Sequence, residues 1–135
     1  MKKIGITGEN GFLGTHLKNY INLKSNYEFI SLGRDYEKNI SKLTNGDILI
    51  HSASIHRNSK PENVYLINMQ INKSLLDLLT RANLSLNIIF LSSIQESLDN
   101  PYGRSKRDGK KLFDDYCKKN GTKFISHKLP NIFGP

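Results

Sequence analysis

Three glycines spaced three residues apart follow the first apolar run of the chain, and they constrain its fold more than any other feature. Gly8, Gly11 and Gly14 separate the β-rich run Lys3–Thr7 from a segment whose apolar residues recur every three or four positions. That spacing is typical of one face of a helix. The apolar residues on that face are Phe12, Leu13, Leu17, Tyr20 and Ile21. The opening of the chain therefore predicts a strand, a tight glycine turn and a helix.

Short apolar runs alternate with helix-like segments along the rest of the sequence. We expect strands over residues 28–32, 47–51, 87–92 and 123–127, and helices over about 62–81 and 102–119. The first of these helices is predicted to turn five apolar side chains inward, namely Leu66, Met69, Leu75, Leu76 and Leu79. Residues 88–91 form a continuous apolar run, typical of a strand covered on both faces. The alternation predicts one α/β domain over residues 1–135, a Rossmann-like doubly wound parallel sheet with right-handed crossovers.

Composition limits the chain to one modest domain without a membrane segment. Of its 135 residues 37% are hydrophobic, and no apolar run approaches the roughly 20 residues that a membrane span needs. The basic start is not followed by the apolar stretch of a secretory signal peptide. The single cysteine, Cys117, excludes a disulfide framework and a cysteine-built zinc site. His51, His56 and His127 lack metal-ligand spacing and are interpreted as structural or surface residues, so we expect a cytoplasmic domain that binds no metal.

The glycine spacing also predicts a binding chemistry. Gly8 permits a tight strand-to-helix turn, Gly11 lets backbone N–H groups approach a pyrophosphate, and Gly14 lets the helix pack close to the sheet. The predicted dinucleotide-binding residues are therefore Gly8, Asn10, Gly11, Phe12, Leu13 and Gly14. The alternative is a turn with a structural role only. A nucleoside-triphosphate loop is excluded because no Gly-Lys-Ser/Thr follows.

Arg34 is the candidate residue for choosing between the two nicotinamide cofactors. It lies in Gly33-Arg34-Asp35, after the second predicted strand and about 20 residues past the glycine turn, where dinucleotide sites contact the adenosine ribose. An acid there accepts hydrogen bonds from a 2′-hydroxyl, whereas an arginine pairs with a 2′-phosphate. Both types are present, but Arg34 comes first, which favours NADPH over NADH or NAD.

The fourth predicted strand ends in two serines, and the next helix begins with a tyrosine four residues before a lysine. Ser92 and Ser93 end the strand, and Tyr102 and Lys106 lie on one face of the helix. This arrangement resembles the Tyr-x-x-x-Lys pair of the short-chain dehydrogenase/reductase family, in its extended, sugar-nucleotide branch. The glycine spacing, residues 47–53, Asn68 and the final residues 130–135 resemble the same branch. The resemblance covers essentially the whole chain.

That resemblance implies a role for each of these residues. Tyr102 would be the general acid that protonates a ketone oxygen, and Lys106 would favour its phenolate and hydrogen-bond the nicotinamide ribose. Ser93 would hold the substrate carbonyl, with Ser92 as the fallback. The resemblance also implies cofactor contacts at Ala53 and Tyr102, and a role for Asn68 in ordering the active site. Pro130 and Asn131 would line the nicotinamide side. For Ala53, Asn68, Pro130 and Asn131 the alternative is a packing or capping role.

The short segment between Ser93 and Tyr102, which are nine positions apart, narrows the resemblance. With residues 129–134 it resembles the reductase domain of bacterial capsular-polysaccharide enzymes that make UDP-2-acetamido-2,6-dideoxy-β-L-talose. The implied activity is NADPH-dependent reduction of a UDP-linked 4-keto sugar. The alternatives are an NAD-dependent epimerase or dehydratase of the same branch and a non-catalytic nucleotide-binding module. Members of this branch are longer, so we expect a C-terminally truncated cofactor half without most of the substrate-binding segment.

The second half of the chain carries most of the net charge of +8. Between Arg104 and Lys123 eight basic residues face three acidic ones. Because exposed aromatic residues are not interleaved with these charges, a solvated helix face is favoured over a nucleic-acid surface. The resemblance implies a UDP-sugar substrate and a homodimer packed through this helix, with contacts from Leu112, Phe113 and Tyr116. Phe113 and Tyr116 also have the spacing of an inward helix face.

Overall fold

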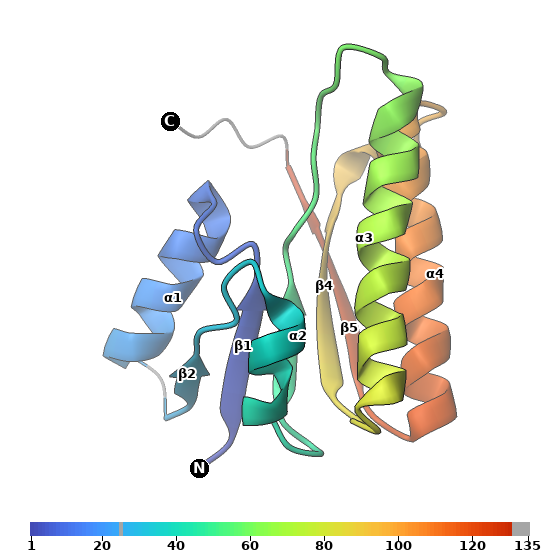
Figure 1. Cartoon of the computed structure of the whole chain (residues 1–135). Helices are drawn as coiled ribbons and strands as arrows, with labels where there is room; N and C mark the ends of the chain where they lie inside the picture. The colour runs from blue at the N-terminus through green and yellow to red at the C-terminus, as the bar shows by residue number, and fades with distance from the viewer. Residues whose placement is uncertain (25, 131–135) are drawn as a thin grey trace.

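Five parallel strands with helices on both faces form the fold in a computed structural model that describes residues 1–24 and 26–130 (Figure 1). The strand order is β2-β1-β3-β4-β5. The strands are β1 (Lys3–Thr7), β2 (Glu28–Ile30), β3 (Ile48–His51), β4 (Asn87–Ser93) and β5 (Phe124–Leu129), and the helices are α1 (Phe12–Lys24), α2 (Tyr36–Asn39), α3 (Glu62–Arg81) and α4 (Pro101–Asn120). Short 3₁₀ turns follow at Ile40–Lys42 and Ile94–Ser97. The predicted Rossmann-like doubly wound sheet is confirmed.

The strand order reverses between β1 and β3, which places a topological switch point at their carboxyl ends. From β1 the chain moves outward to β2, then crosses back to pair β3 on the other side of β1, with Thr7 beside His51. All strands point the same way, so the glycine turn and the starts of α3 and α4 gather at one edge of the sheet (Figure 1). In sheets of this kind ligands bind at that edge, at the switch point.

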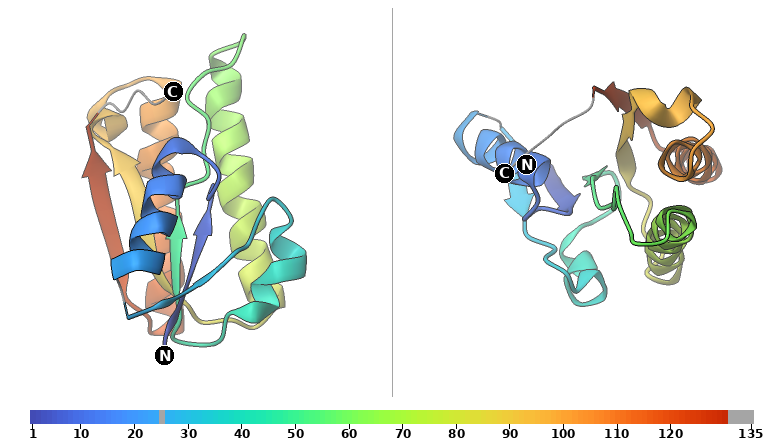
Figure 2. Two further views of the ribbon diagram at one scale, coloured as in Figure 1. Left: turned by 90° about the vertical axis from the view of Figure 1, so that its left-hand side faces the viewer. Right: turned by 90° about the horizontal axis from the view of Figure 1, so that it is seen from above.

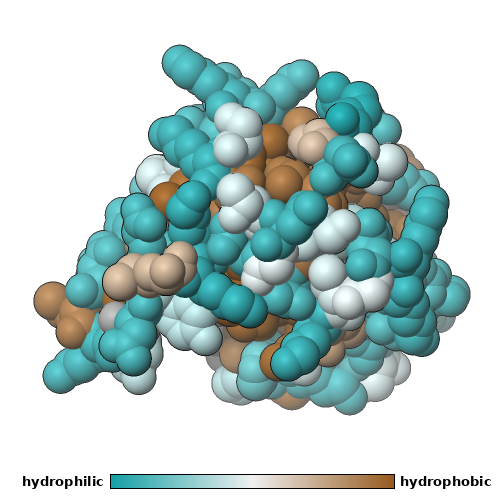
Figure 3. Space-filling view, turned by 90° about the horizontal axis from the view of Figure 1, so that it is seen from below, coloured by the Kyte–Doolittle hydropathy of each residue, from teal (hydrophilic) through white to brown (hydrophobic). Residues whose placement is uncertain are grey.

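The two faces of the sheet are covered unequally, as the end-on view in Figure 2 shows. Helix α1 covers one face over a small core that includes Ile6, Ile21 and Leu91. Helices α3 and α4 cover the other over a larger core built around Phe90 and Phe113. The amino-terminal edge of the sheet, seen from below in Figure 3, is mostly hydrophilic, with apolar side chains showing between the polar ones.

Local sequence signals fix the ends of α4. The Asn100 side chain accepts a hydrogen bond from the Gly103 N–H at 2.7 Å, which caps the first turn, and Pro101 occupies the first helical position. At the other end Gly121 adopts a left-handed φ of 67°, a conformation that ends helices at glycine. This helix therefore presents Tyr102 in its first turn and Lys106 in its second.

Several predictions about segment ends and faces are wrong. Strand β5 ends at Leu129 rather than at residue 127, since its pairing with β4 continues to Ser93. Strand β2 ends at Ile30 rather than Leu32, because the N–H groups of Leu32 and Gly33 donate to the Glu9 side chain instead of to a neighbouring strand. Leu66 is 62% exposed, and α3 buries the amides of Asn68 and Asn72 on its inward face. The outlying residues of the predicted α1 face, Phe12 and Tyr20, are exposed as well.

The dimer contacts expected from α4 also need correction. Phe113 is fully buried and Tyr116 is 8% exposed, both in the core beneath α4 of this same chain. Their predicted inward orientation is confirmed, so they are not available to a second chain.

Among the helices that the structure describes, none is long and apolar enough to cross a membrane.

Candidate active site

The glycine turn is packed so closely that side chains are excluded from it. Gly8 has a left-handed φ of 70°, and a Cβ there would lie 3.1 Å from the Cα of Ala53. A Cβ on Gly14 would lie 2.1 Å from the Gly8 carbonyl oxygen. The N–H groups in the first turn of α1 have no partner within the helix, as at any helix start. This bare cradle, with N–H donors that the helix itself leaves without partners, fits a dinucleotide pyrophosphate.

The remaining predicted residues of the turn contribute mainly through the backbone. Asn10 and Phe12 are exposed, whereas Leu13 packs into the small core beneath α1. Ala53 lies beside Gly8 because the N–H groups of Ser52 and Ala53 both donate to the Thr7 hydroxyl at 3.0 Å. The structure thus brings the predicted glycine turn and Ala53 together at the switch point.

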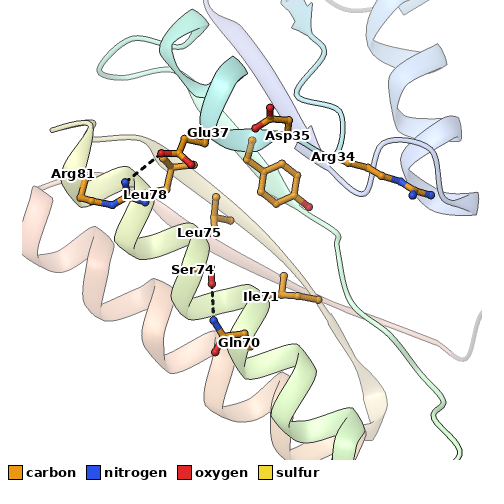
Figure 4. A pocket seen from close by; sticks show the side chains of 10 residues that line it. Arg34, Asp35, Glu37, Gln70, Ile71, Ser74, Leu75, Leu78 and Arg81 are labelled. Carbon is orange, nitrogen blue, oxygen red and sulfur yellow. Dashed lines mark hydrogen bonds and ion pairs between the residues drawn. The ribbon is translucent and has the colours of Figure 1, made fainter.

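Arg34 is exposed in a turn that opens with Gly33, whose φ is 62°. It stands at the entrance of a cavity of about 470 Å³ between α2 and α3. Ile71, Leu75 and Leu78 line the cavity, and the ion pair between Arg81 and Glu37 (3.4 Å) closes one end. Figure 4 shows the Arg34 side chain pointing away from these apolar residues. Its guanidinium is therefore free to meet a ligand at the sheet edge.

Lys106 is the most buried cation of the candidate site, with 6% of its surface exposed. Its Nζ donates to the Leu91 carbonyl at 3.0 Å and to the Ser54 hydroxyl at 3.2 Å. The same atom lies 5.6 Å from the centre of the Tyr102 ring. Burial lowers the pKa of Lys106 to about 8. The ammonium is thus held in place by the end of β4 and by the segment that follows β3.

Tyr102 lies in a half-buried position between two serine hydroxyls. Burial raises the pKa of its phenol, and hydrogen bonds with the side chains of Ser54 and Ser93 partly oppose that rise. We expected Lys106 to bring this pKa down toward neutral pH, and that expectation is wrong for the protein without ligand, because burial dominates. The phenol therefore keeps its proton at neutral pH.

The two serines at the end of β4 point to different partners. The Ser92 hydroxyl donates to the buried carboxylate of Glu96. That carboxylate is also paired with Lys110 at 2.7 Å and with Lys128 at 3.2 Å. Ser93 instead accepts from the Gln95 N–H at 3.1 Å and contacts Tyr102. The geometry favours Ser93 over the fallback Ser92 for binding a carbonyl oxygen.

Two residues near Tyr102 were not predicted for the site. The Ser54 hydroxyl contacts both Tyr102 and Lys106. His56, interpreted from sequence as structural or surface, stacks its ring on Tyr102 with centroids 4.5 Å apart and planes at 26°. Burial, and then the charges of Lys106 and Arg57, lower the pKa of His56. The only sequence signal for both residues is that they follow β3 at the carboxyl edge.

Asn68 holds the segment that carries these two residues. Its Oδ1 accepts from the Ile55 N–H at 2.8 Å, and its Nδ2 donates to the Ile55 carbonyl at 2.9 Å and to the Ser105 hydroxyl at 3.1 Å. The loop after β3 is thereby tied to both α3 and α4. This placement matches the ordering role that the resemblance implied for Asn68.

The histidine that ends β3 is structural, as predicted. His51 is buried, and its ring nitrogens bond Thr7 at 2.7 Å and Asn72 at 2.8 Å. Burial lowers its pKa to about 4, so the ring is neutral at physiological pH. Within residues 1–24 and 26–130 no three His, Cys, Asp or Glu side chains gather in a way that could hold a metal ion.

Pro130 follows β5 directly, and the pairing of Leu129 with Ser93 places it just past the serine end of β4. It is exposed there. Asn131 and the rest of the predicted C-terminal motif lie outside the described residues.

The sequence is similar to those of known proteins. Residues 4–135 match the NAD dependent epimerase/dehydratase family. The chain is 28% identical over 134 residues to a UDP-2-acetamido-2,6-beta-L-arabino-hexul-4-ose reductase of Pseudomonas aeruginosa, a match that covers 98% of this chain and 36% of the relative. The chain therefore spans about a third of the length of that curated relative.

Solved structures share the fold across nearly the whole chain. The capsular polysaccharide assembling protein CapF from Staphylococcus aureus superposes with a TM-score of 0.73 at 29% identity, over 98% of this chain and 35% of that one. RMD from Pseudomonas aeruginosa, solved with NADPH, superposes with a TM-score of 0.83 at 20% identity, over 100% of this chain and 56% of that one. At that lower identity the second match is a likeness of fold.

Proposed function

Because the chain belongs to the NAD dependent epimerase/dehydratase family, we propose that it reduces a 4-keto sugar nucleotide with NADPH. The observation that carries the proposal is the cluster of Ser93, Tyr102 and Lys106, joined through Ser54 to the segment beside the glycine turn. This cluster and a cradle suited to a pyrophosphate share one edge of the sheet. Their juxtaposition supports proton transfer next to a bound nicotinamide.

The protein side of the reaction is the delivery of one proton. A bound reduced nicotinamide supplies a hydride to the carbonyl carbon. Tyr102 donates its phenolic proton to the ketone oxygen as negative charge develops there, and its raised pKa keeps that proton available at neutral pH. The Ser93 hydroxyl donates a hydrogen bond to the same oxygen. Lys106, one turn away, stabilises the phenolate that remains after the transfer.

The substrate and cofactor choices follow from the relatives and from Arg34. The curated relative is named as a reductase of a UDP-linked hexul-4-ose, which supports a UDP-linked 2-acetamido-2,6-dideoxy-hexos-4-ulose as substrate. The exposed Arg34 supports NADPH, since a guanidinium pairs with a 2′-phosphate. The protein would act in the cytoplasm on a surface-polysaccharide precursor, as a homodimer.

The test is cofactor titration followed by turnover. The chain is titrated with NADPH, and consumption of the reduced nicotinamide is then followed after adding the UDP-4-keto sugar. Saturable binding with substrate-dependent oxidation of NADPH is the expected result. Binding without oxidation would favour the non-catalytic nucleotide-binding module, and a tightly retained NAD would favour an epimerase or dehydratase. Absence of binding would contradict every version of the proposal.

A further inference from the structure

Glu9 lies between Gly8 and Gly11, the first two glycines of the motif. Its carboxyl group has no part in the proposed reaction. Glu9 is only 5% exposed. Its Oε1 accepts from the Leu32 N–H at 2.7 Å and from the Gly33 N–H at 2.6 Å, and its Oε2 accepts from the Ser31 hydroxyl at 2.9 Å. The carboxylate therefore lies against the turn that carries Arg34, although Glu9 follows β1 and that turn follows the neighbouring strand β2.

The negative charge of Glu9 is not neutralised by an ion pair. All three of its hydrogen-bond partners are neutral, and none of the ion pairs among residues 1–24 and 26–130 includes it. Its field reaches the neighbouring cavity, since the Glu9 charge adds to burial in raising the pKa of Tyr36. A buried charge is screened by salt much less than an exposed one such as that of Arg34.

A carboxylate at this place distinguishes a hydroxyl from a phosphate. A carboxylate has about four acceptor positions, of which the three hydrogen bonds to Glu9 use three. A ribose 2′-hydroxyl can donate to the remaining position on Oε2. A 2′-phosphate carries negative charge and no free donor at neutral pH, so it is repelled.

We propose that Glu9 is a specificity-determining residue that opposes Arg34 and weakens binding of the cofactor 2′-phosphate. This inference rests on the proposed use of a nicotinamide cofactor. Arg34 attracts the 2′-phosphate from the solvent side, and Glu9 repels it from beneath the turn. The chain consequently binds NADH as well as NADPH, with a smaller preference for NADPH than Arg34 alone would give.

A purely structural role for Glu9 makes a different prediction. If its carboxylate only anchored the Gly33-Arg34 turn, removing the charge would weaken both cofactors alike and leave their affinity ratio unchanged. The quantity to measure is therefore the ratio Kd(NADH)/Kd(NADPH), by calorimetry or by the fluorescence of the bound reduced nicotinamide. This ratio reports on the 2′-position and needs no turnover.

The decisive variants are Arg34→Ala, Glu9→Gln and the double variant. The matched control is Glu28→Gln, which removes an exposed acid at the start of β2, at the opposite edge of the sheet. In Arg34→Ala the ratio should fall below one, to about one-tenth, because only the repulsion remains. Glu9→Gln should raise the ratio about tenfold above that of the unmodified chain, and the double variant should return it to about one. Glu28→Gln should leave it unchanged.

Arg34 is exposed, so Arg34→Ala keeps the test available if Glu9→Gln does not fold. A ratio near one in Arg34→Ala overturns the inference while the proposed function stands. An unchanged ratio in folded Glu9→Gln overturns it as well. If the unmodified chain binds neither cofactor, the proposed function fails and the inference fails with it.

Discussion

The two parts of the candidate site lie on the same sheet edge but are built by opposite means. Around Gly8 and Gly14 the site consists of backbone and of space kept free by missing side chains. Around Tyr102 and Lys106 it consists of side chains whose functional groups are buried and held by hydrogen bonds. The first part is therefore sensitive to added volume, whereas the second is sensitive to the loss of a single polar atom.

Removing the phenolic oxygen of Tyr102 should affect the second part and leave the first part intact. Tyr102→Phe keeps the ring and its stacking on His56 but loses the proton donor. We expect kcat to fall about a thousandfold, the range typical of a lost general acid, with the Kd for NADPH nearly unchanged. Stopped-flow oxidation of NADPH and calorimetry measure the two quantities.

As a control for that experiment, Tyr65→Phe removes a phenol of α3 that donates to Asp108 at 2.7 Å, outside the cluster. Its turnover should stay near that of the unmodified chain. Turnover retained in Tyr102→Phe would remove the tyrosine from the proton-transfer role.

Added volume should break the first part. In Gly14→Ala the new methyl group would meet the Gly8 carbonyl oxygen at 2.1 Å, so the start of α1 must shift. We expect a loss of about 1–3 kcal/mol in the free energy of unfolding, typical of overpacking, and cofactor affinity at least about tenfold weaker.

Gly11→Ala is the matched variant, since its Cβ makes only an ordinary contact at 3.4 Å. It should keep the stability of the unmodified chain and still weaken cofactor binding, because Gly11 is the position where a side chain is expected to obstruct the approach of a pyrophosphate to the backbone N–H groups. Denaturant unfolding and titration with NADPH distinguish the two variants. Equal stability of both would show that helix α1 yields easily at Gly14.

The buried ammonium links the second part to stability. The folded pKa of Lys106 is about 8, below its ordinary value of 10.5, so folding disfavours its charged form. Below about pH 8 this cost is fully present, and it disappears as pH rises from about 8 to about 10.5, because the folded chain then binds fewer protons than the unfolded one. Lys106 therefore lowers stability at neutral pH.

Lys106→Met should consequently be inactive. At neutral pH its free energy of unfolding should equal that of the unmodified chain or exceed it by up to about 2 kcal/mol. The difference in unfolding free energy between Lys106→Met and the unmodified chain should shrink as pH rises from about 7 to about 9. Urea unfolding at several pH values measures it. A difference that grows with pH would contradict the depressed pKa.

The smallest expected effect concerns the ring stacked on Tyr102. His56→Ala should lower kcat only severalfold, because an aromatic pair contributes about 0.5–1.5 kcal/mol. His56→Phe keeps a ring there and should restore the activity. If His56→Phe were as impaired as His56→Ala, the imidazole nitrogens rather than the stacking would matter.

Sequence reasoning succeeded where the signal is local. The glycine turn, and the tyrosine and lysine four positions apart, are readable because turn and helix geometry fix such short spacings. It failed where the partner lies far along the chain. The hydrogen bonds from Leu32 and Gly33 to Glu9 end β2 early. The residues near Glu9 in the sequence give no signal that predicts this contact. Helix α2 was missed, although Asp35 caps it through the Lys38 N–H at 3.2 Å.

Helix faces were predicted only in part, for a related reason. Periodicity identifies the apolar stripe of α3 but not how far the neighbouring elements extend over it. Leu66 belongs to the apolar stripe but is exposed, because the neighbouring elements do not extend over it. Asn68 is buried because its side-chain amide forms hydrogen bonds with the backbone N–H and carbonyl of Ile55. Ser54 and His56 entered the site by the same long-range route, through the loop that Asn68 holds.

The Thr7 hydroxyl helps to position both parts of the candidate site. Thr7 ends β1 next to the glycine turn, and its oxygen receives the N–H groups of Ser52 and Ala53, while Ser54 one residue on receives the ammonium of Lys106. The glycine turn and Lys106 are thereby both connected to the end of β1 through the segment 52–54. A substitution that shifts the end of β1 is therefore expected to move both parts of the candidate site together.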